Sequence, residues 1–149
     1  VYVKIPITNT KGKSTHNLVN KLLKSQISCN VTAIFTVPQI EPLLNSINSN
    51  TPLILSIFAG RIADTGVDPL PLMKKCVKKS KNKKNIEILW ASTREILNIF
   101  QADNINCHII TVPNNLLNKL DNYKKNLKLF SRETVVDFYK DAKSAGFNI

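Results

Sequence analysis

The chain has 149 residues, of which 43% are hydrophobic and 7% aromatic. This composition suits one compact domain rather than two domains or a disordered tail. No run approaches the roughly 20 apolar residues of a membrane-spanning helix, and the first residues lack the basic and then apolar plan of a secretory signal. We therefore expect a cytoplasmic protein without a membrane partner.

The net charge of +11 introduces nucleic acid as a candidate partner. Most of this charge comes from lysine, because arginine occurs only at Arg61, Arg94 and Arg132. The densest lysine run, residues 74–84, contains no aromatic side chain that could stack on a base. We interpret the run as a solvated outer face and expect no nucleic-acid partner.

The cysteines, Cys29, Cys76 and Cys107, are odd in number and widely spaced. Only His16 and His108 could join them as metal ligands, and no C-x-x-C motif is present. We expect neither a structural zinc site nor a disulfide framework.

Strand-like and helix-like segments alternate along the chain, which predicts parallel strands joined by crossover helices and hence an α/β fold. The expected strands cover residues 1–7, 29–35, 53–58, 86–92 and 107–112. The expected helices start after the cap Ser14, near Pro38, at Pro71, at the cap Thr93, near 115 and at Ser131.

Two further segments have distinct expectations. Residues 59–70 contain two of the four glycines and are expected to form a long loop of the kind that carries function. The last helix places apolar residues at helical spacing as far as Ala145, ends at Gly146, and is expected to cover the domain.

Two architectures fit this order. A doubly wound sheet of about five strands would be complete at this length, whereas a (β/α)8 barrel needs about 250 residues. Alternation of side chains places a polar residue of every strand on the face opposite a purely apolar face. By the same alternation, Ile34 is expected to share a face with Thr32, and Trp90 with Ser92. Barrel strands have this pattern, because their outer face packs on helices and their inner residues converge at the mouth. These polar side chains are Lys4, Thr32, Ser56, Ser92 and Thr111.

Lys4 shares its strand face with Tyr2 and Pro6, and no carboxylate lies nearby in sequence. Burial would favour the neutral amine, which is the form that attacks a carbonyl. The alternative is a lysine at the strand's end whose ammonium reaches water. Lys4 alone leaves both interpretations open.

Two of the arginines follow strands that are neighbours in sequence. Arg61 comes directly after Gly60, and Arg94 lies two residues after Ser92. Each alone would fit a surface salt bridge. Together at one barrel mouth they predict a phosphate site, because a guanidinium pairs bidentately with phosphate oxygens. Arg132 opens the last helix and is expected to be structural.

Four segments carry a resemblance to a known family: Val3–Pro6 (VKIP), Asn30–Ala33 (NVTA), Ser56–Ile62 (SIFAGRI) and Ala91–Arg94 (ASTR). They resemble the V-K-[VI]-P, N-[VL]-T, S-P-F-V-G-R-I and A-S-[FIV]-R motifs of the transaldolase family of class I aldolases. Members of that family are (β/α)8 barrels that process phosphorylated sugars through a lysine Schiff base. The resemblance covers nearly the whole chain.

The resemblance implies a role for each matched residue. It implies an imine on Lys4, hydrogen bonds from Asn30 and Thr32 to the intermediate and a catalytic water, and substrate contact by Ser56. It further implies an aromatic wall at Phe58 and a phosphate site at Arg61, Ser92 and Arg94. No metal or organic cofactor is implied. Phosphorylated sugars of pentose-phosphate metabolism are the implied substrates, and the full-length protein is expected to be a homo-oligomer.

The sequence also departs from the family pattern. Ile57 replaces a proline, Trp90 an alanine and Thr93 a larger apolar residue. The family's first three strands, on the order of 80 to 100 residues, are missing, together with the acids that handle protons. We therefore expect residues 1–149 to be the C-terminal part of one barrel domain, strands four to eight plus a C-terminal helix, and to be inactive alone.

Two alternative functions remain. The fructose-6-phosphate aldolase subgroup cleaves rather than transfers, and it places a tyrosine where this chain has Phe58, which favours transfer. An alternative of another class is a non-catalytic module that binds sugar phosphates or nucleic acid on a five-stranded sheet.

Overall fold

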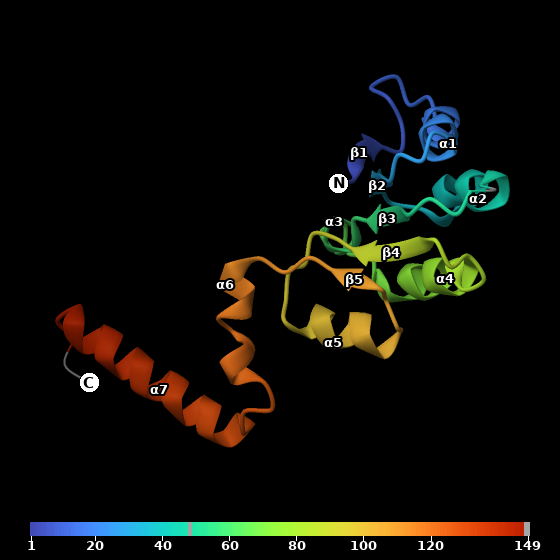
Figure 1. Ribbon diagram of the computed structural model, residues 1–149. Coiled ribbons are helices and arrows are strands. Elements are labelled where there is room, and N and C mark those ends of the chain that lie inside the picture. Colours follow the sequence, from blue (N-terminus) through green and yellow to red (C-terminus); the bar gives the residue numbers. More distant parts are fainter. Residues whose placement is uncertain (48, 148–149) are drawn as a thin grey trace.

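A computed structural model describes residues 1–47 and 49–147. Five parallel strands form one sheet in the order in which they occur in the chain (Figure 1). The strands are β1 (Val3–Pro6), β2 (Cys29–Ile34), β3 (Leu53–Ile57), β4 (Ile86–Trp90) and β5 (Ile109–Ile110). The helices are α1 (His16–Lys24), α2 (Val37–Ser46), α3 (Ala59–Ala63), α4 (Leu70–Ser80), α5 (Leu97–Asn104), α6 (Asn114–Leu117) and α7 (Leu127–Ser144), with a short 3-10 turn η1 (Leu120–Asn122).

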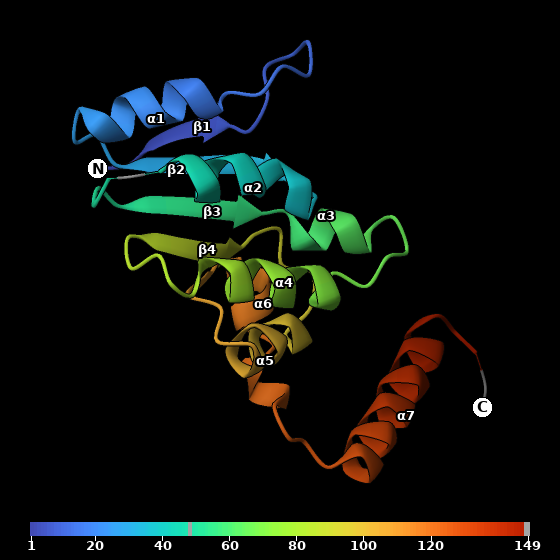
Figure 2. The ribbon, with the colours of Figure 1, turned by 90° about the vertical axis from the view of Figure 1, so that its right-hand side faces the viewer.

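The expected α/β class is confirmed, and the sheet is consistent with the C-terminal five strands of a (β/α)8 barrel. Helices α1, α2 and α4 lie along one face of the sheet (Figures 1 and 2). A parallel sheet needs such crossover helices between its strands. The strands β1 and β5 are its two edges.

The main core lies between this face and the helices. In β2, β3 and β4 the residues on this face, such as Val31, Leu55 and Ile88, are fully buried against apolar residues of α1, α2 and α4. The opposite face carries a small separate cluster of Ile54, Leu89 and Ala91, with Phe58 and Ile109 packed on it. The two faces are therefore unequal, as expected for a barrel strand with a helix-covered outside and a polar inside.

A β-bulge at Ala33 changes the alternation in β2. Val31 pairs with Leu55, but Ile34 pairs with Ile57, so β2 has one residue more than β3 over this stretch. Ala33 takes up the extra residue with a left-handed φ of 59°. Ile34 consequently turns into the helix-side core, and the expectation that it shares a face with Thr32 is wrong.

The helix after β2 begins as the sequence predicts. The Gln39 side-chain oxygen accepts hydrogen bonds from the backbone N–H groups of Phe35 (2.8 Å) and Thr36 (3.0 Å). Pro38 lies in the first turn, where a missing N–H costs nothing. Ile40 and Leu43 are fully buried on the inner side of α2.

Several expected boundaries are wrong. The segment after β3 is not simply a long loop, because Ala59–Ala63 form α3 directly at the end of the strand. Strand β5 covers only Ile109–Ile110. Helix α1 starts at His16, so Ser14 is not its cap residue. Thr93 does not cap α5, since its hydroxyl donates to the Thr111 carbonyl instead (2.6 Å).

The last helix does not cover the domain. Helix α7 starts at Leu127 rather than Ser131, so Arg132 lies within it, and it projects away from the sheet beyond α6 (Figures 1 and 2). No residue of α7 is buried, and its Phe138 is 68% exposed. Only its expected end at Gly146 is confirmed, with a φ of 83°. No helix within residues 1–47 and 49–147 has the length and apolar character to cross a bilayer.

Candidate active site

Lys4, Asn30 and Ser56 form a polar row across three neighbouring strands. Lys4 and Asn30 are paired in the parallel register of β1 and β2, so both project from the same face. The Ser56 hydroxyl on β3 donates to Asn30 Oδ1 (2.7 Å). This bond fixes the amide, and Nδ2, which has no partner among residues 1–47 and 49–147, can donate to a ligand.

Lys4 itself is exposed, which agrees with the interpretation of a strand-end lysine that reaches water and not with that of a buried amine. Strand β1 is an edge of the sheet, and no helix within the described residues covers the face from which Lys4 projects. Lys4 nevertheless projects from the same face as the Asn30 side chain, and not from the face that the helices cover.

Thr32 follows Asn30 on the same face, two residues nearer the carboxyl end of β2. Its side chain is 7% exposed, and Oγ1 has no hydrogen-bond partner among the described residues. A buried hydroxyl without a partner costs free energy, so its presence needs an explanation other than stability.

Phe58 and Arg61 lie at the carboxyl end of β3. Phe58 packs on the small cluster of the inner face and against Phe35, with ring centroids 5.8 Å apart. The Arg61 guanidinium carbon lies 5.2 Å from the centre of the Phe58 ring. This cation–π contact holds an exposed arginine close to the inner face.

Gly60 brings the loops after β3 and β4 into direct contact. Its N–H donates to the Ala91 carbonyl (3.3 Å). A Cβ on Gly60 would lie 1.5 Å from the Ser92 carbonyl oxygen, so only glycine fits here. The contact holds Arg61 and Ser92 at the same end of the sheet.

Ser92 reaches this end by a different route from the one expected. Alternation along β4 places Ile88 and Trp90 in the helix-side core, so Ser92 does not share an inner face with them. The strand ends at Trp90, and Ser92 adopts a left-handed φ of 61° just beyond it. The sequence-based assignment of Ser92 to a strand face is therefore wrong.

Part of the Arg94 guanidinium already has a hydrogen-bond partner in the protein. Its Nε donates to Asp64 Oδ1 (3.1 Å), and its Nη2 donates to Asp64 Oδ2. The Arg94 backbone N–H donates to Asn98 Oδ1 (3.0 Å). Asp64 was missed in the sequence because 30 residues separate it from Arg94. The one available signal was the place of Asp64 four residues after Gly60, on the first turn past β3.

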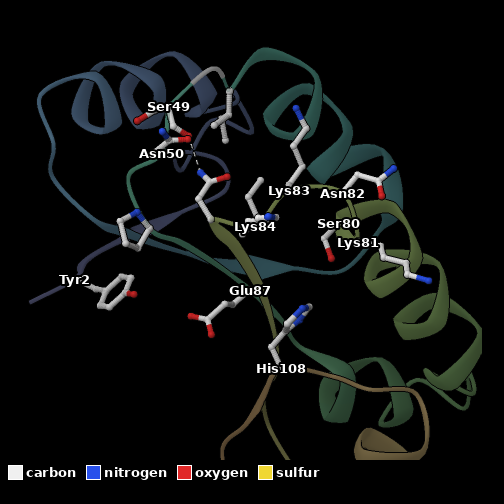
Figure 3. A pocket seen from close by; sticks show the side chains of 14 residues that line it. Tyr2, Ser49, Asn50, Ser80, Lys81, Asn82, Lys83, Lys84, Glu87 and His108 are labelled. Carbon is white, nitrogen blue, oxygen red and sulfur yellow. Dashed lines mark hydrogen bonds between the residues drawn. The ribbon is translucent and has the colours of Figure 1, made fainter.

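A cavity of about 890 Å³ lies at the opposite end of the strands. Its lining comes from the segments that precede β1, β3, β4 and β5, including Tyr2, Lys83 and His108, and from the start of β4 with Glu87 (Figure 3). His108 is held by its Nδ1, which accepts from the Ile88 N–H (3.0 Å). Barrel enzymes place their chemistry at the carboxyl ends of the strands, so we do not assign the active site to this cavity.

The cysteines are unsuited to nucleophilic chemistry. The pKa of the Cys76 thiol is raised to about 12, chiefly by burial and to a smaller extent by the neighbouring Cys107, while Lys79 acts in the opposite direction. Burial also raises the pKa values of Cys29 and Cys107. Since the thiolate is the nucleophile, Lys4 is the better candidate.

Comparison with known proteins identifies the family. The family model described as Transaldolase/Fructose-6-phosphate aldolase matches residues 1–149. The chain belongs to this family.

Named relatives agree with this family. The chain is 37% identical over 121 residues to "Probable transaldolase 2" of Listeria monocytogenes serovar 1/2a, a match covering 80% of this chain and 52% of that protein. It is 36% identical over 118 residues to "Probable transaldolase" of Thermoanaerobacter sp. strain X514, covering 78% and 51%. A third, "Probable transaldolase" of Caldicellulosiruptor saccharolyticus, is 34% identical over 122 residues, covering 80% and 52%. The chain spans about half the length of these curated relatives.

Proposed function

We propose that this chain is part of a transaldolase that transfers a dihydroxyacetone unit from a ketose phosphate to an aldose phosphate. The single observation that supports this most is the polar row. Lys4 is paired with Asn30, and Asn30 is oriented by Ser56, on adjacent strands of one sheet. An amine beside a fixed amide donor suits a carbonyl substrate, because the amide can stabilise charge that develops on its oxygen.

In this proposal the neutral Lys4 amine attacks the C2 carbonyl of the ketose, and loss of water gives an imine. The C4 hydroxyl then gives up its proton, the C3–C4 bond breaks, its electron pair passes into the protonated imine, and the aldose phosphate leaves as an aldehyde. The resulting enamine attacks the aldehyde carbon of a second aldose phosphate, and hydrolysis releases the new ketose from Lys4. Asn30 Nδ2 would hydrogen-bond the hydroxyl groups of the intermediate, and the unpartnered Thr32 hydroxyl would hold the catalytic water.

Arg61, Ser92 and Arg94 would bind the phosphate. Arg61 and Arg94 follow adjacent parallel strands, and the Gly60–Ser92 contact keeps the two loops together. A phosphate held at this end would place the sugar carbonyl over the inner face, where Lys4 lies. The chemistry needs no metal or organic cofactor.

We further propose that residues 1–149 form the C-terminal part of a single barrel domain whose first three βα units lie outside this chain. The open strands β1 and β5 would pair with them. The chain alone would lack the acids that handle protons and would be inactive. The full-length protein would act in the cytoplasm as a homo-oligomer, in which a second copy covers the exposed α7.

The test is borohydride reduction of the full-length protein in the presence of fructose 6-phosphate, followed by peptide mass mapping. We expect an adduct on Lys4 and none in the Lys4→Met variant. Lys24, at the end of α1, serves as the internal control because it lies outside the polar row. Absence of an adduct on Lys4 would refute the Schiff-base mechanism.

Transfer is favoured over simple cleavage by the residue at position 58. Phe58 has no hydroxyl with which to run proton transfer to water, whereas the cleaving subgroup has a tyrosine there. We expect little free dihydroxyacetone from fructose 6-phosphate alone and rapid turnover once an aldose phosphate acceptor is added. Release of free dihydroxyacetone at the same rate without an acceptor would favour the aldolase alternative.

A further inference from the structure

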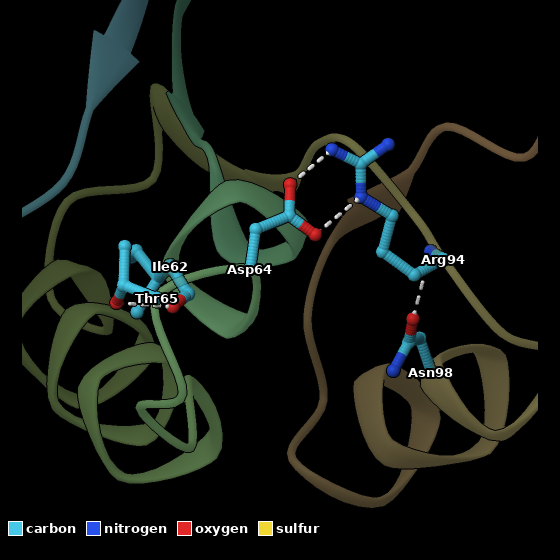
Figure 4. Close-up of polar contacts among 5 residues, drawn as sticks. All are labelled: Ile62, Asp64, Thr65, Arg94 and Asn98. Carbon is cyan, nitrogen blue, oxygen red and sulfur yellow. Dashed lines mark hydrogen bonds and ion pairs between the residues drawn. The ribbon is translucent and has the colours of Figure 1, made fainter.

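We propose that Asp64 is a positioning residue that presents one edge of the Arg94 guanidinium to a phosphate group. Figure 4 shows the arrangement: the Asp64 carboxylate faces Arg94 from the residue directly after α3, and Asn98 approaches Arg94 from α5. The inference rests on the proposed function only in taking Arg94 as a phosphate ligand.

The guanidinium has two edges that can each bind an oxyanion bidentately. Asp64 takes the edge formed by Nε and Nη2. The other edge, formed by Nη1 and the second N–H of Nη2, has no hydrogen-bond partner among the described residues. A phosphate can therefore bind Arg94 while Asp64 stays in place, so Asp64 acts as a support and not as a competitor for the same donors.

Both ends of Arg94 are fixed to different elements. Its backbone N–H is bound by Asn98, and its guanidinium is bound by Asp64. Asp64 is fixed in turn, because its own N–H donates to the Gly60 carbonyl (2.9 Å) and Gly60 contacts Ser92. Arg94 and its support are thus tied to the same contact between the β3 and β4 loops.

Two effects of Asp64 on phosphate affinity oppose each other. An arginine without a partner loses side-chain conformational entropy when it binds a ligand. Asp64 lowers this cost of binding because it already holds the Arg94 side chain in place before the ligand arrives. The negative charge of Asp64 repels the phosphate. Both side chains are about half exposed, so the surrounding water, with its high dielectric constant, weakens this repulsion. We therefore expect the ordering effect to win, and Asp64 to strengthen phosphate binding.

The test measures binding of inorganic phosphate to the full-length protein by phosphorus NMR line broadening, at constant physiological ionic strength. Asp64→Asn keeps one acceptor oxygen but loses the bidentate ion pair. We expect its phosphate dissociation constant to rise about three- to fivefold, and that of Asp64→Glu to stay closer to wild type. In an Arg94→Lys background, where no bidentate pair can form, Asp64→Asn should have no further effect.

The matched control is Glu41→Gln, which removes the same charge from a different exposed ion pair, with Lys79 (3.0 Å). This control should bind phosphate as wild type does. Wild-type protein that binds no phosphate, an unchanged or tighter constant in Asp64→Asn, or an equal loss in the Arg94→Lys background would each overturn the inference. Borohydride trapping on Lys4 is scored separately. A trapped imine with no Asp64 effect refutes only the positioning role, and the expected Asp64 effect without an imine refutes only the Schiff-base function.

Discussion

Gly60 and Ser92 approach so closely that a methyl group on Gly60 would lie 1.5 Å from the Ser92 carbonyl oxygen. The close approach joins the carboxyl ends of β3 and β4 through backbone atoms, which cannot move aside as a flexible side chain can. Arg61, Ser92, Asp64 and Arg94 all lie within a few residues of this contact. The geometry of the proposed phosphate site therefore depends on a residue that has no functional group.

Replacing Gly60 by alanine should separate these two loops. We expect Gly60→Ala to lower the free energy of unfolding by about 3 kcal/mol, because the neighbouring atoms are backbone and the strain cannot be relieved locally. The measurement is chemical denaturation of the full-length protein. Gly66→Ala is the control, since a Cβ there meets nothing within 4 Å, although its φ of 81° carries a cost of about 1 kcal/mol. Equal losses in the two variants would contradict the importance of the contact.

Removing the Thr32 hydroxyl should affect activity without weakening the fold. Because Thr32 Oγ1 is buried without a partner, Thr32→Val should leave the free energy of unfolding unchanged or raise it by up to about 1 kcal/mol. Turnover of the full-length protein should fall by about 100-fold or more if the hydroxyl holds the catalytic water.

A second threonine provides the comparison for this experiment. Thr93 donates to the Thr111 carbonyl at 2.6 Å, so Thr93→Val should cost about 1 to 2 kcal/mol of stability. A Thr32→Val protein that is strongly destabilised would show that the hydroxyl has a structural partner after all.

The Cys76 thiol should give stability a dependence on alkaline pH. Its folded-state pKa is about 12 because of burial, against an ordinary value of 9.0 in the unfolded chain. Between these values the folded state keeps a proton that the unfolded state releases, so stability falls as pH rises above about 9. Thermal melts of wild type and Cys76→Ala at a series of alkaline pH values isolate this contribution from other titrating groups. Identical pH slopes would argue against it.

The exposed helix α7 should be the site of self-association in the full-length protein. Phe138→Glu places a charge on its apolar surface and should raise the dissociation constant of the oligomer about tenfold or more. Sedimentation velocity measures the effect. Lys140→Glu is the control, because Lys140 is a polar residue of the same helix with a side chain 71% exposed. Loss of the oligomer in both variants would point to net charge rather than to the apolar surface.

Local sequence patterns predicted most of the sheet and its helices. Alternation in β1 and β3 placed Lys4 and Ser56 on the face opposite the helix-side core, and the register of the sheet agrees. Ile40 and Leu43 stand at helical spacing in the sequence, and both are fully buried on the core side of α2. Such patterns succeed because each depends only on neighbours along the chain.

The errors have a common cause in contacts that are distant in sequence. Alternation could not reveal the bulge at Ala33, which moves the Ile34 side chain to the other face of the sheet. It also could not reveal the left-handed turn at Ser92, after which the alternation of β4 no longer applies. The ion pair between Asp64 and Arg94 depends on two loops meeting at Gly60. Alternation likewise could not decide between a buried and an exposed Lys4, because its burial depends on a cover over the inner face of β1 that the described residues do not supply.

The bulge at Ala33 also bears on insertions and deletions. The bulge takes up Ala33, so Asn30 and Thr32 face inward and Ile34 faces the helices within a single strand. Deleting Ala33 alone would leave Ile34 directly after Thr32, where plain alternation still turns it to the helices, and the pairing with β3 would become regular. Inserting one further residue beside Ala33 would instead exchange the polar and apolar sides of everything after it in the strand. Position 33 should therefore tolerate deletion, and substitution by glycine, far better than it tolerates an insertion.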